Sequence, residues 1–263
     1  MPPSSSARLA PLLQDPRLWR ATSLGECKLP TLSSGFPLLD AELPGGGWPT
    51  HMLSEILLPH LACAEWRLLG PALRPLLQGA SARQLLLVNP PHMPHLPGLQ
   101  AYGITPQQLV WIAPDQPQQI LWALEQAIKA NSAAAVLAWL PQASANQIRR
   151  LQAMSTASQA PVFVFRPRAA YQQSSAAPLR LMLAIGDDWQ LRVHLLKRRG
   201  PAHTGWLQLP ALPPQLAEHL SARQLRSPAM PRHANTPHAP HEMEDLAHEH
   251  PALARPAAYG AHA

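Results

Sequence analysis

Cysteine is nearly absent from this chain, which has only Cys27 and Cys63 among its 263 residues. Two cysteines make neither a disulfide framework nor the ligand spacing of a zinc site. The sequence therefore excludes a disulfide-stapled secreted domain and a cysteine-based metal centre. This usage is typical of a reducing compartment, and we expect a cytoplasmic protein.

Long hydrophobic runs are also missing. No segment approaches the ~20 consecutive apolar residues that a membrane-spanning helix requires. The first residues, MPPSSSARLAPLLQDPRLW, lack the basic start and the continuous apolar core of a secretory signal. We therefore expect a soluble protein that makes no membrane contact.

Charged and aromatic side chains are sparse. Only 14% of the residues are charged, and 21 Lys and Arg against 15 Asp and Glu give a formal net charge of +6. Because this charge reflects scarce acids rather than dense basic clusters, it favours nucleic acid or an acidic partner only weakly. Aromatic residues make up 5% of the chain, which leaves few side chains on which the bases of single-stranded DNA could stack.

Apolar residues are plentiful enough for a core, at 46% of the chain. The 32 prolines gather in connections and at both ends, which predicts short ordered elements between stiff loops. We expect a flexible N-terminal arm over residues 1–30, an α/β domain over 31–209, and a disordered Pro/Ala/His-rich tail over 210–263.

Apolar runs and helical spacings alternate along the middle of the chain. They predict strands over 52–58, 85–88, 109–112, 133–140 and 161–165, and helices over 61–78, 115–130 and 144–158. Asp115, with Gln118 three residues later, predicts a capping box at the start of the second helix. This order predicts a mostly parallel sheet flanked by helices.

A C-terminal antiparallel hairpin is predicted over residues 179–185 and 189–196. Its period-two pattern places Arg180, Arg192 and His194 on the wetter side. The preceding segment, 169–177, is predicted to be a mobile loop.

The most informative stretch runs from Leu43 to Leu69, LPGGGWPTHMLSEILLPHLACAEWRLL. Its three glycines allow a tight turn before an apolar strand, and a helix follows the strand. In a strand, loop and helix of this kind, the loop N–H groups and the helix N-terminus can bind phosphate. The stretch resembles the entry to the ATP-binding core of the RecA recombinase, which implies a RecA-like fold.

The phosphate-binding loop is degenerate in this resemblance. In an ungapped match, the two loop glycines fall on Leu58 and Cys63, the phosphate-gripping lysine on Ala64, and the magnesium-binding hydroxyl on Glu65. The resemblance therefore implies no nucleotide cofactor, no bound metal and no catalytic residue.

Two further strand ends support this interpretation. The strand that carries the catalytic glutamate in RecA ends here in Asn89-Pro90-Pro91, and the strand that carries the magnesium-binding aspartate ends in Trp139-Leu140-Pro141. An active ATPase or recombinase is disfavoured, because phosphoryl transfer needs these groups. His92 and His95 do not supply a metal site instead, since the prolines around them disfavour a helix and no third ligand is near.

A closer resemblance is to the ImuA family, the RecA-like, SulA-related proteins of bacterial translesion-synthesis cassettes. It covers roughly Leu32 to Leu209 and rests on the ELPGGGWP turn, an E-x-R-L-L helix, the AVLAWLP strand and a terminal L-K-R-R-G. It implies a non-catalytic accessory subunit in SOS-induced mutagenic DNA repair. The implied partners are an ImuB-type, Y-family-like adaptor and, through it, an ImuC-type DNA polymerase III alpha subunit; contact with RecA and weak binding of single-stranded DNA are also compatible.

A SulA-like inhibitor of cell division, which binds the tubulin-like protein FtsZ, is the alternative left open by the resemblance. SulA proteins are shorter and generally lack a long histidine-rich tail. A neighbouring Y-family-like gene would favour the role in mutagenesis.

Basic residues end two of the predicted strands, and a RecA-like sheet could bring both groups to one rim. The predicted rim for DNA phosphates or an acidic partner consists of Arg166, Arg168, Tyr171, Lys197, Arg198 and Arg199. Tyr171 is its nearest stacking aromatic. The plain alternative is a solvated strand end, which is ordinary on protein surfaces.

Overall fold

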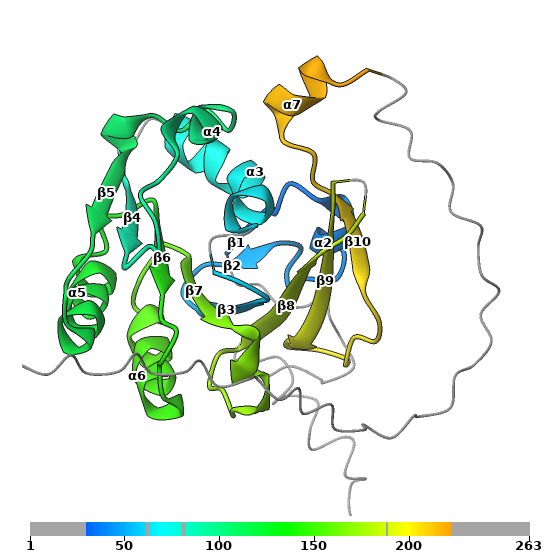
Figure 1. The fold of residues 1–263 in the computed structure, drawn as a ribbon. Helices are drawn as coiled ribbons and strands as arrows, with labels where there is room; N and C mark the ends of the chain where they lie inside the picture. Colours follow the sequence, from blue (N-terminus) through cyan, green and yellow to red (C-terminus); the bar gives the residue numbers. More distant parts are fainter. Residues whose placement is uncertain (1–29, 62–63, 80–82, 188, 222–263) are drawn as a thin grey trace, which may run out of the picture. The chain divides into compact units, whose positions relative to one another are not determined.

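The computed structural model describes residues 30–61, 64–79, 83–187 and 189–221, all of which belong to one unit of the chain, residues 1–227. These residues form an α/β fold with a mostly parallel sheet, as the sequence predicts (Figure 1). The helices are α2 (Pro37–Asp40), α3 (Glu65–Gln78), α4 (Leu96–Gln100), α5 (Pro117–Ala130), α6 (Ala145–Ser155) and α7 (Pro214–His219), with 3-10 turns η2 (Pro106–Gln108) and η3 (Arg168–Gln172).

The main sheet has eight strands in the order β10-β9-β8-β3-β7-β6-β4-β5. They are β3 (Leu53–Leu58), β4 (Leu85–Val88), β5 (Leu109–Ile112), β6 (Ala135–Trp139), β7 (Val162–Pro167), β8 (Leu179–Ile185), β9 (Gln190–Lys197) and β10 (Leu207–Pro210). Only β9 runs against the others, because it pairs antiparallel with both β8 and β10. The predicted parallel strands and the predicted C-terminal hairpin are confirmed.

Helices cover both faces of this sheet, which explains why its central strands are apolar throughout. On one face, Leu69 and Leu73 of α3 pack with Ile56 and Phe163 of the sheet. On the other face, α5 and α6 pack against the alternate residues of the same strands, such as Val164. Figure 1 shows α3 on one side of the sheet and α5 and α6 on the other.

Helix starts differ from the prediction. Helix α3 begins at Glu65, not at residue 61, and it continues through Pro71 and Pro75. The predicted capping box at Asp115 is wrong: α5 begins at Pro117, which suits a first turn because its missing N–H would have no helical partner there. A capping box does form at α6, between Ser144 and Gln147.

The backbone geometry of the turn requires glycine at these positions. Gly45 and Gly46 have φ angles of 80° and 81°, which L-residues with side chains rarely adopt. A Cβ atom on Gly47 would lie 2.4 Å from the carbonyl oxygen of Leu32. The turn thereby brings β2 (Trp48–Pro49) against β1 (Thr31–Leu32), a two-stranded sheet that the sequence pattern did not indicate.

The C-terminal boundary of the domain also differs from the prediction. Residue 209 lies inside β10, which extends the main sheet beyond the predicted hairpin, and α7 follows. The predicted arm, apart from Pro30, and the predicted tail from residue 222 onward lie outside the described residues.

None of the helices in the described part of the chain combines the length and hydrophobicity that a bilayer crossing requires.

Candidate functional site

The segment that we predicted to be a degenerate phosphate-binding loop lies between the end of β3 and the start of α3. Leu58, the last residue of β3, is fully buried, and Ala64 directly before α3 is 4% exposed. Cys63 lies outside the described residues. Two of the predicted loop positions are therefore filled by apolar atoms that belong to the core.

Glu65 occupies the N-terminus of α3 with its own carboxylate. The side chain is 2% exposed, and its Oε2 accepts a hydrogen bond from the Ala64 N–H at 3.0 Å. A helix N-terminus favours negative charge because its N–H groups and dipole point outward. The buried Glu65 carboxylate therefore lies at a position that favours an anion.

Trp139 holds this carboxylate from the neighbouring part of the sheet. Its Nε1 donates to Glu65 Oε1 at 2.9 Å, and its ring lies 4.9 Å from that of Phe165. Asn89, with a φ of 54°, donates from Nδ2 to the Trp139 carbonyl at 2.8 Å. The ends of β4 and β6 are thus joined to each other and to α3.

Glu55 is fully buried on β3, between arginines of the two adjacent strands. Arg166 Nη1 on β7 lies 2.8 Å from Glu55 Oε1, and Arg180 Nε on β8 lies 3.0 Å from Oε2. The register explains this, because Arg180 is directly opposite Glu55 and Arg166 is opposite Leu57. Two guanidinium groups and one carboxylate leave a net positive charge inside the domain, a costly arrangement unless hydrogen bonds compensate it.

The two arginines obtain these hydrogen bonds from the segment after β7. Arg166 Nη2 donates to Gln173 Oε1 at 2.6 Å, and Arg180 donates to the backbone carbonyls of Ala170, Tyr171 and Gln173. Where we expected a mobile loop, residues 168–172 form η3 around this cluster. The cluster of Glu55, Arg166 and Arg180 is called the buried triad below.

Three arginine predictions are corrected by these contacts. Arg166 is 1% exposed and Arg180 is 7% exposed, so Arg166 is no rim cation and Arg180 does not lie on the wetter side of the hairpin. Arg198 points toward the glycine turn, where its Nη1 lies 2.6 Å from Glu42 Oε2. In each case a carboxylate from another strand or turn attracts the guanidinium inward.

The remaining rim residues divide into two groups. Tyr171 and Lys197 line a polar cavity of about 450 Å³, whereas Arg168 and Arg199 do not line it. Lys197 is exposed and donates to the Ser175 carbonyl at 2.9 Å. None of the described residues that line the cavity is acidic, and the buried triad reaches its wall through Arg180.

Two histidines in this cavity were missed by the sequence analysis. His194 lies 5.3 Å from the ring of Trp206, and the Nδ1 atom of His203 is buried without a hydrogen-bond partner in the described part of the chain. The period-two pattern had placed His194 on the wetter side of the hairpin, so the sequence did contain a signal for its exposure. Nothing in the local sequence indicated that His203, from the following connection, lies beside it.

His95 has a structural role. It is the N-cap of α4, and its Nδ1 accepts a hydrogen bond from the Gly98 N–H at 3.2 Å. Within the described ranges, no three His, Cys, Asp or Glu side chains are grouped so that they could hold a metal ion.

Comparison with known proteins identifies no relative: no protein-family model matches the chain, and no curated protein matches it significantly.

Proposed function

We propose that this chain is a non-catalytic, ImuA-like accessory subunit of an SOS-induced mutagenic translesion-synthesis complex. In this proposal it has a RecA-like core, binds an ImuB-type adaptor, and reaches an ImuC-type polymerase through that adaptor. The family resemblance supplies the partners, and the structure supplies three physical arguments that support the proposal.

The strand order supports a RecA-like core. Strand β3, which precedes the degenerate loop, lies between β7 and β8, and the sheet continues through β6 and β4 to β5. The antiparallel β9 comes after the parallel strands. A mostly parallel sheet with helices on both faces and an antiparallel strand after the parallel ones agrees with the order that the RecA resemblance implies.

The observation that carries the non-catalytic role is the Glu65 carboxylate at the start of α3. A bound phosphate would have to displace a buried anion that already has hydrogen bonds from Trp139 and Ala64. The binding of a second anion in its place would be opposed by charge repulsion and by the loss of these bonds.

The residues that carry the ImuA resemblance contact each other in pairs. Glu42 of the ELPGGGWP turn pairs with Arg198 of L-K-R-R-G, and Glu65 of the E-x-R-L-L helix accepts from Trp139 of the AVLAWLP strand. Distant motifs that meet in this way have a shared structural reason to occur together. These contacts therefore support the resemblance, and they do so independently of what the family does in the cell.

Complex formation with the adaptor tests the function. The full chain and a purified ImuB-type protein are expected to elute as one complex in size-exclusion chromatography. Loss of the gene is expected to lower the frequency of ultraviolet-induced mutation as strongly as loss of the adaptor gene.

A SulA-like role predicts different results. The chain would then inhibit the assembly and GTPase activity of purified FtsZ, and its expression would produce filamentous cells without the adaptor gene. That outcome, together with no adaptor complex and unchanged mutation frequency, would overturn the proposal.

Magnesium-ATP is expected not to bind to a defined site. Isothermal titration should give no saturable heat, because Ala64 cannot replace the phosphate-binding lysine and the Glu65 carboxylate, already held by Trp139 and Ala64, would repel the phosphates. Tripolyphosphate is the control, since equal heat from both compounds would indicate charge attraction rather than nucleotide recognition. A magnesium-dependent dissociation constant in the micromolar range would contradict this prediction.

A further inference from the structure

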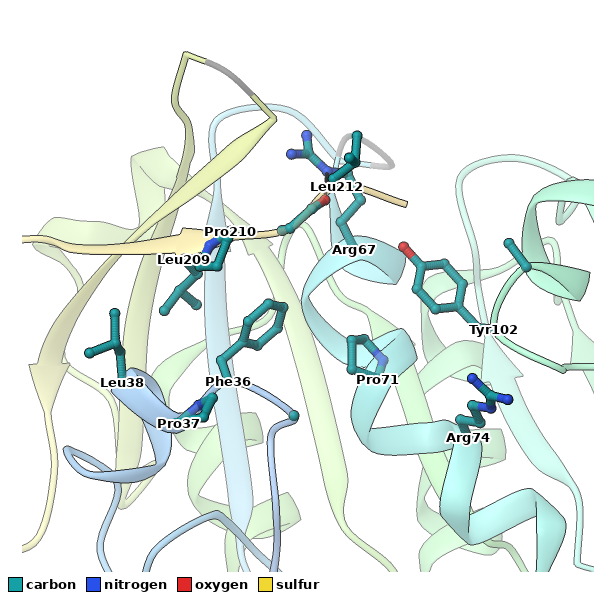
Figure 2. Close-up of a pocket in the computed structure, with 13 residues that line it drawn as sticks. Phe36, Pro37, Leu38, Arg67, Pro71, Arg74, Tyr102, Leu209, Pro210 and Leu212 are labelled. Carbon is teal, nitrogen blue, oxygen red and sulfur yellow. Dashed lines mark hydrogen bonds between the residues drawn. The ribbon is translucent and has the colours of Figure 1, made fainter. Parts of the chain in front are cut away.

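A groove of about 460 Å³ lies between α2, α3 and β10, and Leu58, Ala64 and Glu65 do not line it. Figure 2 shows Phe36 and Pro71 facing each other across it, with Tyr102 beside them and Leu212 at its upper edge. Its lining is mostly apolar, and its volume lies within the range of binding pockets. The proposed function does not assign a role to this groove.

Helix α3 contributes two arginines to the groove. Arg67, Pro71 and Arg74 share one face of the helix because they are spaced by four and three residues. Arg67 is engaged within the protein: its Nε donates to the Ala211 carbonyl at 3.0 Å, and its guanidinium lies 5.9 Å from the ring of Trp189.

Arg74 differs from Arg67. It is exposed, and within the described ranges it makes no hydrogen bond or ion pair. Among the described residues, the lining of the groove contains no acidic side chain. The nearest acid in sequence on α2, Asp40, is occupied by the Ser33 hydroxyl and the Ser34 N–H at 2.6 and 2.7 Å. The groove therefore offers an uncompensated cation beside apolar surface.

The walls of the groove are held in place. Gly35, with a φ of 80°, allows α2 to approach α3 so closely that a Cβ there would lie 2.5 Å from Pro71 Cβ. A Cβ on Gly70 would lie 2.5 Å from the ring of Tyr102, whose hydroxyl has its pKa raised by burial. Rigid walls lower the entropy cost of binding, so an occupant would gain affinity from this preorganisation.

Leu38 is an exposed apolar side chain at the open edge of the groove. It is 58% exposed although α2 fixes its backbone, and the exposed prolines Pro37 and Pro210 lie on the same rim. Exposed apolar surface around a preformed groove is a feature of protein-binding sites.

We propose that this groove binds a short segment of a partner protein, with a large apolar side chain against Leu38 and Phe36 and a carboxylate against Arg74. The apolar lining matches the apolar side chain, and the Arg74 cation matches the carboxylate, so one ligand should carry both groups. This inference rests on the proposed function only in naming the ImuB-type adaptor as the source of the segment.

A phage-displayed library of random dodecapeptides, selected on the immobilised full chain, tests the groove without reference to the adaptor. Selected peptides are expected to combine an aromatic or large aliphatic residue with Asp or Glu. The variants Leu38→Asp and Arg74→Glu should each weaken binding roughly tenfold or more, as loss of a central contact does. Met93→Asp and Arg83→Glu are matched controls at exposed positions outside the groove, and they should bind like the native chain.

Charge reversal sharpens the test. Replacing the acidic residue of a selected peptide by lysine should abolish binding to the native chain and restore it to the Arg74→Glu variant. Far-ultraviolet circular dichroism of both groove variants checks that they remain folded. No selected peptides, or peptides that bind the groove variants and the native chain equally, would overturn the inference.

Binding of the ImuB-type adaptor to the groove variants distinguishes the two proposals. Adaptor binding that is lost in Leu38→Asp and Arg74→Glu supports both, whereas binding that these variants leave unchanged overturns the assignment of the adaptor to the groove and leaves the function standing. If the adaptor fails to bind while peptides do, the function fails and the groove stands. A dimer in sedimentation analysis that Leu38→Asp dissociates would assign the groove to a second copy and overturn the inference.

Discussion

Replacing Glu55 by glutamine is expected to lower the free energy of unfolding by about 3–5 kcal/mol. The substitution removes the negative charge of the buried triad and leaves Arg166 and Arg180 as two unpaired cations inside the domain. Both arginines are held by hydrogen bonds to the segment around η3, so neither can turn outward without breaking them. Urea unfolding, followed by tryptophan fluorescence, measures this loss.

Two further variants show whether the charge imbalance is the cause. Glu218→Gln removes an exposed carboxylate on α7 and should change stability by less than about 0.5 kcal/mol. Combining Glu55→Leu with Arg166→Met and Arg180→Met should recover most of the lost stability, because apolar residues can replace a buried ion cluster. Hydrogen exchange in residues 168–173 should still rise in this triple variant. A Glu55→Gln chain as stable as the Glu218→Gln control would refute the explanation.

Single-stranded DNA is expected to bind weakly, and the double variant Arg168→Glu/Lys197→Glu should abolish this binding. Lys197 lines the polar cavity beside Tyr171, and the net positive charge of the buried triad lies behind it. Each phosphate contact should add about 0.7 to the slope of log affinity against log salt. Fluorescence anisotropy with labelled oligothymidylate at several salt concentrations measures both quantities.

The choice of variants follows from the structure. Changing Arg198 to glutamate would place it against Glu42 and disturb the glycine turn, so Arg198 is left unchanged in this test. The double variant Lys129→Glu/Arg83→Glu, at exposed positions away from this rim, is the matched control because it changes the net charge by the same amount, and it should bind DNA like the native chain. Equal affinity and equal salt dependence in the double variant and the control would mean that this rim does not bind DNA.

The layered sheet could be predicted because its signals are local. The apolar runs of β3, β6 and β7 are short and lie between turns, and the helices between them show regular spacing of three and four residues. Burial of both sheet faces selects such sequences. Helix starts were less predictable, because α3 begins where Glu65 meets Trp139, a residue 74 positions further along the chain.

The buried triad could not be predicted for a related reason. An arginine at a strand end usually points to solvent, and the sequence pattern offered no reason to treat Arg166 or Arg180 differently. Glu55 and Arg166 are separated by 111 positions, and only the order β8-β3-β7 brings their strands together. A charge pair between strands depends on this order, which periodicity within a single strand does not contain.

The sequence by itself determined the alternation of strands and helices, because this alternation depends on residue type at given positions. Tertiary structure alone decided how the charged groups are placed: the Glu65 carboxylate lies at the start of its own helix, Arg166 and Arg180 turn inward to Glu55, and Arg74 lies beside an apolar groove with no ion pair among the described residues. The physical reason is that a buried charge loses its hydration, so the free energy of burying it depends on the nearest partner. These partners come from distant parts of the chain.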